Sequence, residues 1–203
     1  MTKMTQARST RQTRTIEQQF AVREEDGQRR IEGYFSVFGP EYQLWPGASE
    51  SIDPHAFDGC MGDDVRVLTN HDTTRVLGRT RAGTAELRVD EHGLWGSALI
   101  NEADTDATNT WARVARGDVS QASFGFDILD EEETVREDGS VHWTIKAVRL
   151  YEVSVVTFPA YTDTEIAARR ADYATIQQRR RDAWRAQNLA RLKRAHRRRS
   201  KDA

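Results

Sequence analysis

Short apolar-rich segments alternate with turn residues along most of the chain, a pattern that predicts many short β-strands. Hairpin turns are expected at Asp26-Gly27, at residues 90–93 and at Asp138-Gly139. Strands are expected over residues 20–22, 30–38, 65–70, 75–79, 85–89, 94–100, 121–126, 141–145 and 147–158. Seven to nine strands with short connections favour antiparallel pairing in a barrel or sandwich.

Helical patterns are fewer than strand patterns. Asp53-Pro54 is a favourable helix start, because Asp caps free amides and Pro tolerates the first helical position, so a short helix is expected through Phe57. A second helix is expected over residues 101–116, and the pattern is again helical from Thr164 onward. Residues 39–51 contain two prolines and two glycines and are expected to form a loop.

Charge divides the chain into an acidic body and a basic tail. Residues 165–203 contain thirteen Lys and Arg residues against four acidic ones, a net charge of +9. The whole chain has a net charge of −2, so residues 1–164 carry −11. We therefore predict a mobile extension over residues 1–18, a β domain over residues 19–164 and a basic helical tail over residues 165–203.

Composition excludes several classes of protein. No apolar run approaches the roughly 18 residues of a membrane span, and the first twenty residues lack the apolar segment of a secretory signal. Cys60 is the single cysteine, which rules out an internal disulfide and agrees with a reducing compartment. No ligand spacing for a metal and no glycine-rich phosphate loop occurs, so no cofactor is expected.

A serine lies within an apolar strand pattern at residues 121–126. Side chains alternate along a strand, so Phe124 and Phe126 should face one way, and Ser123 and Gly125 the other. Gly125 would leave space beside the hydroxyl for another chain's backbone. Ser123 is therefore a candidate nucleophile, and the alternative is an ordinary core strand with a bend.

The segment around Glu152 is apolar on both faces. Glu152 should share one face with Val148, Leu150, Ser154 and Val156, opposite Tyr151, Val153 and Val155. A carboxylate in such a strand loses several kcal/mol of hydration unless it has a partner such as histidine or arginine. The alternative is an edge strand with Glu152 in water.

His71 follows the strand predicted over residues 65–70. A single histidine at a strand end is usually a surface residue, and the other histidines lie in predicted loops, turns or the tail: His55, His92, His142 and His196. Together with Ser123 and Glu152, however, His71 would complete a nucleophile, a base and an orienting acid. Cys60 is a competing nucleophile, but nothing near it in the sequence indicates activation.

Seven blocks, in this order, resemble the prohead (capsid-maturation) protease family of tailed bacteriophages, whose fold is related to that of the herpesvirus assemblins. They extend from about residue 30 to residue 165. The blocks are Gly33-Tyr34-Phe35-Ser36-Val37-Phe38, Glu50-Ser51-Ile52-Asp53-Pro54-His55-Ala56-Phe57, Val67-Leu68-Thr69-Asn70-His71-Asp72, Leu77-Gly78-Arg79, Gly93-Leu94-Trp95, Ser123-Phe124-Gly125-Phe126 and Glu152-Val153-Ser154-Val155-Val156-Thr157-Phe158-Pro159-Ala160-Tyr161.

The resemblance implies a serine endopeptidase with an antiparallel β-barrel. It places the nucleophile at Ser123 and the base at His71, with Glu152 as third member and Asp72 as the competing acid. Assemblins use a second histidine at the third position, which would make the contribution of the acid modest. Oxyanion donors are expected to be backbone amides, with Arg149 or Arg79 holding the loop that supplies them.

The implied substrates are the phage major capsid protein, its scaffolding segment and the chain itself. The implied location is the assembling procapsid in the host cytoplasm, with no membrane partner; homodimerisation, on which the related viral enzymes depend, is left open. The basic tail over residues 165–203 could dock onto acidic scaffold or onto the inside of the shell, and its charge would also suit nucleic acid. The alternative function is a non-enzymatic assembly scaffold or chaperone that binds shell protein through this tail.

Overall fold

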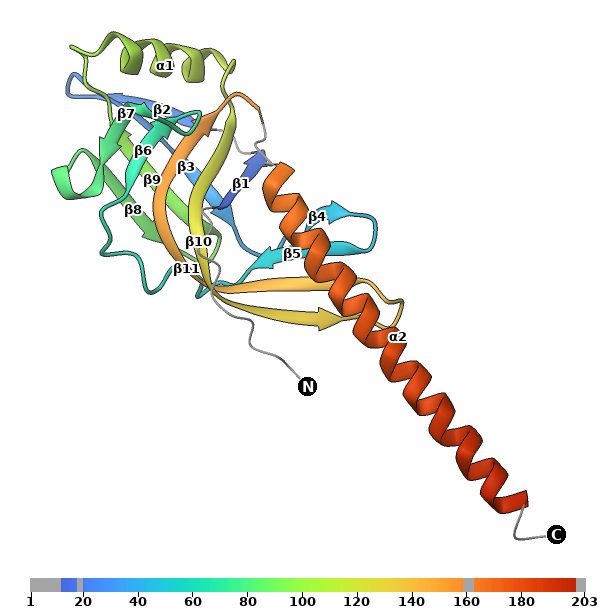
Figure 1. The fold of residues 1–203 in the computed structure, drawn as a ribbon. Helices are drawn as coiled ribbons and strands as arrows, with labels where there is room; N and C mark the ends of the chain where they lie inside the picture. The colour runs from blue at the N-terminus through green and yellow to red at the C-terminus, as the bar shows by residue number, and fades with distance from the viewer. Residues whose placement is uncertain (1–11, 18–19, 159–162, 200–203) are drawn as a thin grey trace. The chain divides into compact units, whose positions relative to one another are not determined.

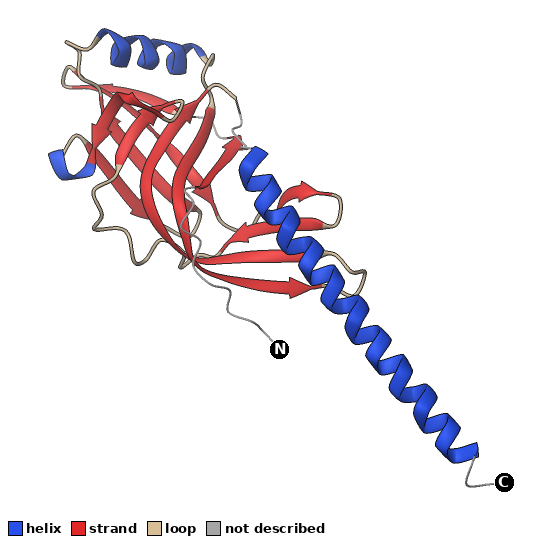
Figure 2. Cartoon of the chain, viewed as in Figure 1, coloured by secondary structure: helices blue, strands red, loops and turns tan. Residues whose placement is uncertain are grey.

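The computed structural model describes residues 12–17, 20–158 and 163–199, which fall into two compact units divided between residues 162 and 163. The first unit is mainly β (Figures 1 and 2). Its strands are β1 Gln12–Glu17, β2 Ala21–Glu25, β3 Gln28–Val37, β4 Tyr42–Trp45, β5 Ala48–Ile52, β6 Arg66–Thr69, β7 Asp72–Arg79, β8 Ala85–Val89, β9 Gly93–Leu99, β10 Gln121–Val135 and β11 Val141–Val156. Its helices are the 3-10 helix η1 Thr80–Ala82 and the α-helix α1 Thr105–Arg116, and the second unit is the helix α2 Asp163–Arg199.

The strands form two sheets. One contains β1, β10, β11, β5 and β4 in that order, with β6 joining β11 to β7, and the other has the order β2-β3-β9-β8. The mainly β prediction is confirmed, but the purely antiparallel barrel is not what the chain forms. β11 pairs parallel with β5 over residues 141–145 and with β6 over residues 152–155. This strand is long enough for two separate partners, both of which run in its own direction.

The core of the first unit lies beneath the strand that carries Ser123. Phe124 and Phe126 are fully buried and stack with ring centroids 4.6 Å apart, and Phe57 meets Phe124 edge-on at 5.6 Å. Aromatic pairs in this geometry contribute beyond the area that they bury. The expectation that these two rings anchor the serine strand in the core is therefore confirmed.

Three segments differ from the sequence prediction. Residues 39–51 are not a loop, since they contain β4 and β5 joined through Gly47, whose φ of 86° suits a tight turn. Residues 53–63 form successive turns rather than a helix, because backbone N–H groups bond three residues back, as from Ala56 to Asp53. Residues 12–17 form β1 instead of a mobile extension, because β10 supplies their pairing partners; residues 1–11 and 18 lie outside the described residues.

Helix α1 begins and ends at recognisable caps. Asp104 Oδ1 accepts hydrogen bonds from the backbone of Asp106 and Ala107, and Gly117 ends α1 with a φ of 85°. α1 contacts β2, β3 and β7 across one end of the β unit (Figure 2). Among the described residues, no helix is long and apolar enough to cross a membrane.

Candidate active site

His71 lies at the tip of the β6–β7 hairpin. Thr69 pairs with Asp72, which leaves Asn70 and His71 as a two-residue turn with φ angles of 52° and 59°. A two-residue hairpin favours positive φ at both positions, and asparagine tolerates it well. A histidine in this region is strained by roughly 1 kcal/mol, so surrounding contacts must hold it in place.

Those contacts come from the end of β11. The backbone N–H of His71 donates to Ser154 Oγ at 3.2 Å, and that of Asn70 donates to the carbonyl of Val155 at 2.9 Å. Beyond the strand, the N–H of Thr157 donates to Asn70 Oδ1 at 2.9 Å. The turn is thus fixed to β11 at three successive points.

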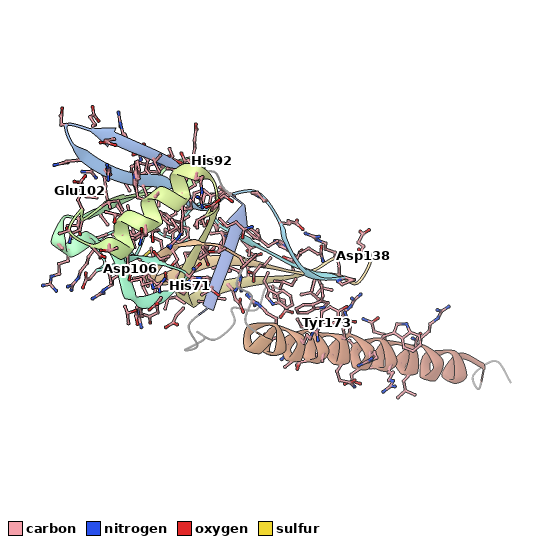
Figure 3. The ribbon with its side chains drawn as sticks, turned by 90° about the horizontal axis from the view of Figure 1, so that it is seen from above. His71, His92, Glu102, Asp106, Asp138 and Tyr173 are labelled. Atoms are coloured by element: carbon pink, nitrogen blue, oxygen red, sulfur yellow. The ribbon has the colours of Figure 1, made fainter. Side chains whose placement is uncertain are left out.

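Glu152 lies in the interior of the sheet and binds the imidazole of His71. It is 1% exposed on β11, with β10 on one side and β6 on the other, so the alternative of an edge strand in water is wrong. His71 Nδ1 is 2.7 Å from Glu152 Oε1 (His71 is labelled in Figure 3), and Ser154 Oγ donates to Glu152 Oε2 at 2.6 Å. A carboxylate at Nδ1 selects the tautomer with its proton on Nδ1, which leaves Nε2 of a neutral ring as a proton acceptor.

Ser123 is the neighbour of this pair on β10. It pairs with Ser154, and Gly125 pairs with Glu152, so Ser123, Ser154 and Glu152 lie on the same face of the sheet. Ser123 is fully buried, and neither its Oγ nor His71 Nε2 has a hydrogen-bond partner among the described residues. The structure therefore joins base to acid but not serine to base, a contact that often tightens only when substrate is bound.

The other sequence candidates lie in different surroundings. Asp72 accepts hydrogen bonds from the backbone and hydroxyl of Thr74, chiefly the hydroxyl, and these lower its pKa. Arg79 donates two hydrogen bonds to the carboxylate of Asp64, from Nε and Nη2, while Arg149 interacts with Tyr151. Neither arginine is thereby placed against the serine.

Cys60 is not poised for nucleophilic attack. Its thiol is buried and donates to the carbonyl of Phe57 at 3.2 Å, and burial raises its pKa to about 11. A thiol with a raised pKa contains little of the reactive thiolate at neutral pH. Among the described residues, no group of three His, Cys, Asp or Glu side chains gathers as a metal site.

A second buried histidine, His142, is held by two hydroxyls. It lies within β11 rather than in a turn, with Nδ1 2.8 Å from Ser49 Oγ and Nε2 2.9 Å from Ser51 Oγ. Ser49 donates to Glu41 Oε2 at 3.1 Å, so it accepts from Nδ1–H, and Ser51 then donates to Nε2. Both ring nitrogens are occupied, which indicates a structural role.

His142 should make folding depend on pH. Its pKa is lowered by burial in the first place and also by Arg136, against the opposing effects of Glu41 and Glu50. The unfolded chain takes up this proton near pH 6.5 and the folded chain only at lower pH. The stability due to the neutral ring is present above about pH 6.5 and is lost as pH falls through the native pKa. Urea unfolding at pH 8 and pH 5 should show a smaller pH-dependent loss for His142→Gln than for the unchanged chain; equal losses would contradict this assignment.

Ser154 is a site residue whose role the sequence did not reveal. Its hydroxyl donates to Glu152 and accepts from the backbone of His71, so it connects the acid to the turn that carries the base. The sequence offered one signal for this role: Ser154 lies two residues from Glu152 and so on the same face of the strand. The hydrogen bond to His71 depends on the β6–β7 turn and could not be foreseen.

Ser154→Ala is expected to lower kcat for any reaction in which His71 acts as the base by roughly ten- to a hundredfold, because small displacements of catalytic groups cost up to about 10²-fold. Ser36→Ala is the matched control: Ser36 is also fully buried, and its hydroxyl has no partner among the described residues. Steady-state kinetics of the two purified variants should separate them. Equal kcat values would remove the positioning role of Ser154.

A buried serine and a buried carboxylate on neighbouring strands, with a histidine on an adjoining turn, are the side chains that serine hydrolases use. A sequence model of the family described as "Caudovirus prohead serine protease" matches residues 18–179. The chain belongs to this family.

The chain is also similar to two individual proteins. It is 30% identical over 151 residues to the prohead protease of Enterobacteria phage HK97, an alignment that covers 72% of this chain and 63% of that protein. The chain thus spans less than two thirds of the length of this relative. The structure of the bacteriophage T4 capsid assembly protease is also similar, with a TM-score of 0.47 and 12% identity. The match covers 73% of this chain and 98% of the T4 chain.

Proposed function

We propose that the chain is a serine endopeptidase in which Ser123 is the nucleophile, His71 the general base and Glu152 the acid that orients the base. The observation that carries the proposal is the 2.7 Å contact between His71 Nδ1 and Glu152 Oε1. This contact leaves Nε2 as the acceptor, and neither Nε2 nor Ser123 Oγ, both buried, has a hydrogen-bond partner in the described part of the chain.

In this mechanism Ser123 Oγ attacks the scissile carbonyl carbon while His71 Nε2 takes the hydroxyl proton. Glu152 stabilises the imidazolium that forms and remains ionised. The ring then returns the proton to the leaving amine, which breaks the carbon–nitrogen bond and leaves an acyl group on Ser123. Water then attacks the acyl carbon while Nε2 takes one of its protons. Nε2 returns that proton to Ser123 Oγ as the ester bond breaks, which releases the carboxylic acid product and restores the serine.

The substrates that we propose are the capsid protein and scaffolding segments of a tailed phage, and the chain itself, processed inside the procapsid in the host cytoplasm. Membership of the prohead protease family supports this choice, as does the similarity to the prohead protease of phage HK97. Residues 19–164 would form the protease domain, related to the assemblins. The basic residues 165–203 would dock onto acidic scaffold or the shell interior, and pairing of two chains remains part of the proposal.

The test is co-expression of the chain with the capsid protein of the same phage, followed by mass spectrometry of the intact products. The unchanged chain should yield defined fragments, and Ser123→Ala should yield none while its thermal unfolding stays the same. Fragments that persist with folded Ser123→Ala would overturn the proposal. Capsid assembly that needs residues 165–203 but not Ser123 would favour the non-enzymatic scaffold instead.

A further inference from the structure

The N-terminal strand β1 is paired with the part of β10 that carries Ser123. Six antiparallel pairs run from Gln12–Phe126 to Glu17–Gln121, and Thr15 stands opposite Ser123. Figure 1 shows β1 beside β10. β1 therefore runs alongside Ser123 and is paired with β10 both before and after this residue. An extended peptide laid along a serine protease's nucleophile would occupy the same kind of position.

Without β1, this stretch of β10 would be a sheet edge. β10 has β11 on its other side, and residues 121–126 have no third neighbour in the described sheet. An open edge presents unpaired N–H and C=O groups, and these bind an extended peptide by adding it as a further strand. Neighbouring strands lie about 4.8 Å apart, so such a peptide would bring a backbone carbonyl close to Ser123.

Ser123 is not accessible in the state that the structure describes. Its side chain is fully buried, and β1 lies directly beside it. A substrate carbonyl must contact Oγ for attack to occur, so a covering segment has to move first. β1 holds the edge that an added strand would need.

One side chain fixes β1 to the rest of the unit. Arg14 forms an ion pair with Glu50 on β5, with Nη2 3.0 Å from Oε2, and its guanidinium lies 5.5 Å from the centre of the Phe126 ring. Arg14 and Glu50 are each at most 1% exposed. β1 also precedes residues 18–179, the part of the chain that the family model matches. β1 therefore lies outside the residues that the family model matches and is attached to the unit at a buried ion pair.

We propose that the β10 edge at residues 121–126 binds the substrate peptide as an added antiparallel strand, and that β1 occupies this edge as an internal competitor. The inference rests on the proposed function and specifies how that site takes its substrate. Release of β1 opens the edge, and its return closes it.

A disulfide lock tests whether β1 must leave. Glu17 and Gln121 are directly paired, a position whose Cα separation of about 5 Å suits a disulfide, and neither residue belongs to the proposed triad. The purified, oxidised Glu17→Cys/Gln121→Cys chain, incubated with purified capsid protein, should cleave at least 90% less of it than the unchanged chain. A thiol reductant should restore that cleavage, so each sample is its own folding control.

A binding measurement tests whether the β10 edge takes a peptide, independently of catalysis. The probe is a fluorescein-labelled synthetic peptide with the sequence of residues 9–20, titrated against full-length chains carrying Ser123→Ala. Adding Arg14→Ala should strengthen peptide binding at least tenfold, because it removes the anchor of the internal strand. If that chain is unstable, Arg14→Ala/Glu50→Gln removes the anchor without leaving a buried carboxylate unpaired. The oxidised lock should not bind the peptide.

The outcomes separate the two proposals. Cleavage that depends on Ser123 but is the same in the oxidised and reduced lock would overturn edge binding and leave the protease intact. Peptide binding that is equal in the unlocked, Arg14→Ala and locked chains would also overturn it. Binding that follows the expected order, without Ser123-dependent cleavage in any chain, would support the edge as a peptide site and overturn the protease.

Discussion

Ser123→Ala and His71→Ala are each expected to lower kcat for peptide hydrolysis by at least about 10³-fold. Without the hydroxyl there is no nucleophile, and without the imidazole no group accepts its proton at neutral pH. The double variant should be no slower than the slower single variant, because residues that act as one unit lose their joint effect once. Steady-state kinetics on a cleaved capsid peptide, identified by the co-expression experiment, would measure all three.

The loss of activity in these variants should not result from unfolding. Ser123 Oγ has no hydrogen-bond partner among the described residues, so Ser123→Ala breaks no such bond, and its unfolding free energy should change little. His55→Ala is the matched histidine control, since His55 is exposed and contacts only surface groups such as Asp58. Losses that simply multiply in the double variant would contradict a joint role for Ser123 and His71.

Local patterns in the sequence predicted strands well where alternation and turn residues agreed. Asp26 and Gly27 have φ angles of 51° and 74° between β2 and β3, the turn that their side chains favour. The prediction for residues 39–51 was wrong because their prolines and glycines were taken to indicate a loop. Gly47 serves a tight hairpin there, and β5 is stabilised by its distant partner β11. Pairing between strands a hundred residues apart leaves no local signal.

The candidate site was predictable as a set of residues, but not as a connected network. The apolar surroundings of Glu152 indicated a buried carboxylate that needs a partner, and His71 is that partner. The link through Ser154, and the pairing of β1 beside Ser123, depend on how separate strands meet. Residues 12–17 lack apolar periodicity because β1 is held by backbone pairing and the Arg14–Glu50 ion pair.

The choice between two neighbouring acids gives the second large expected effect. Glu152→Gln should lower kcat by about 10³- to 10⁴-fold, because the amide removes the charge that stabilises the imidazolium. Its NH₂ group can also donate to Nδ1 and so select the tautomer with Nε2 protonated, which is unable to act as the base. Asp72→Asn should change kcat less than threefold, since the Asp72 carboxylate bonds to Thr74 and lies outside the buried pair.

Kinetics of the two variants at one pH, alongside thermal unfolding, decide between the acids. With the NH₂ group toward Nδ1, the amide oxygen still accepts from Ser154 Oγ, so Glu152→Gln keeps a bonded side chain and should remain folded. A modest loss, below about tenfold, would mean that His71 is oriented mainly by its turn and by the Ser154 hydrogen bond to its backbone. A large loss for Asp72→Asn with little for Glu152→Gln would transfer the acid's role to Asp72, and would require the hairpin tip to turn His71 away from the interior of the sheet.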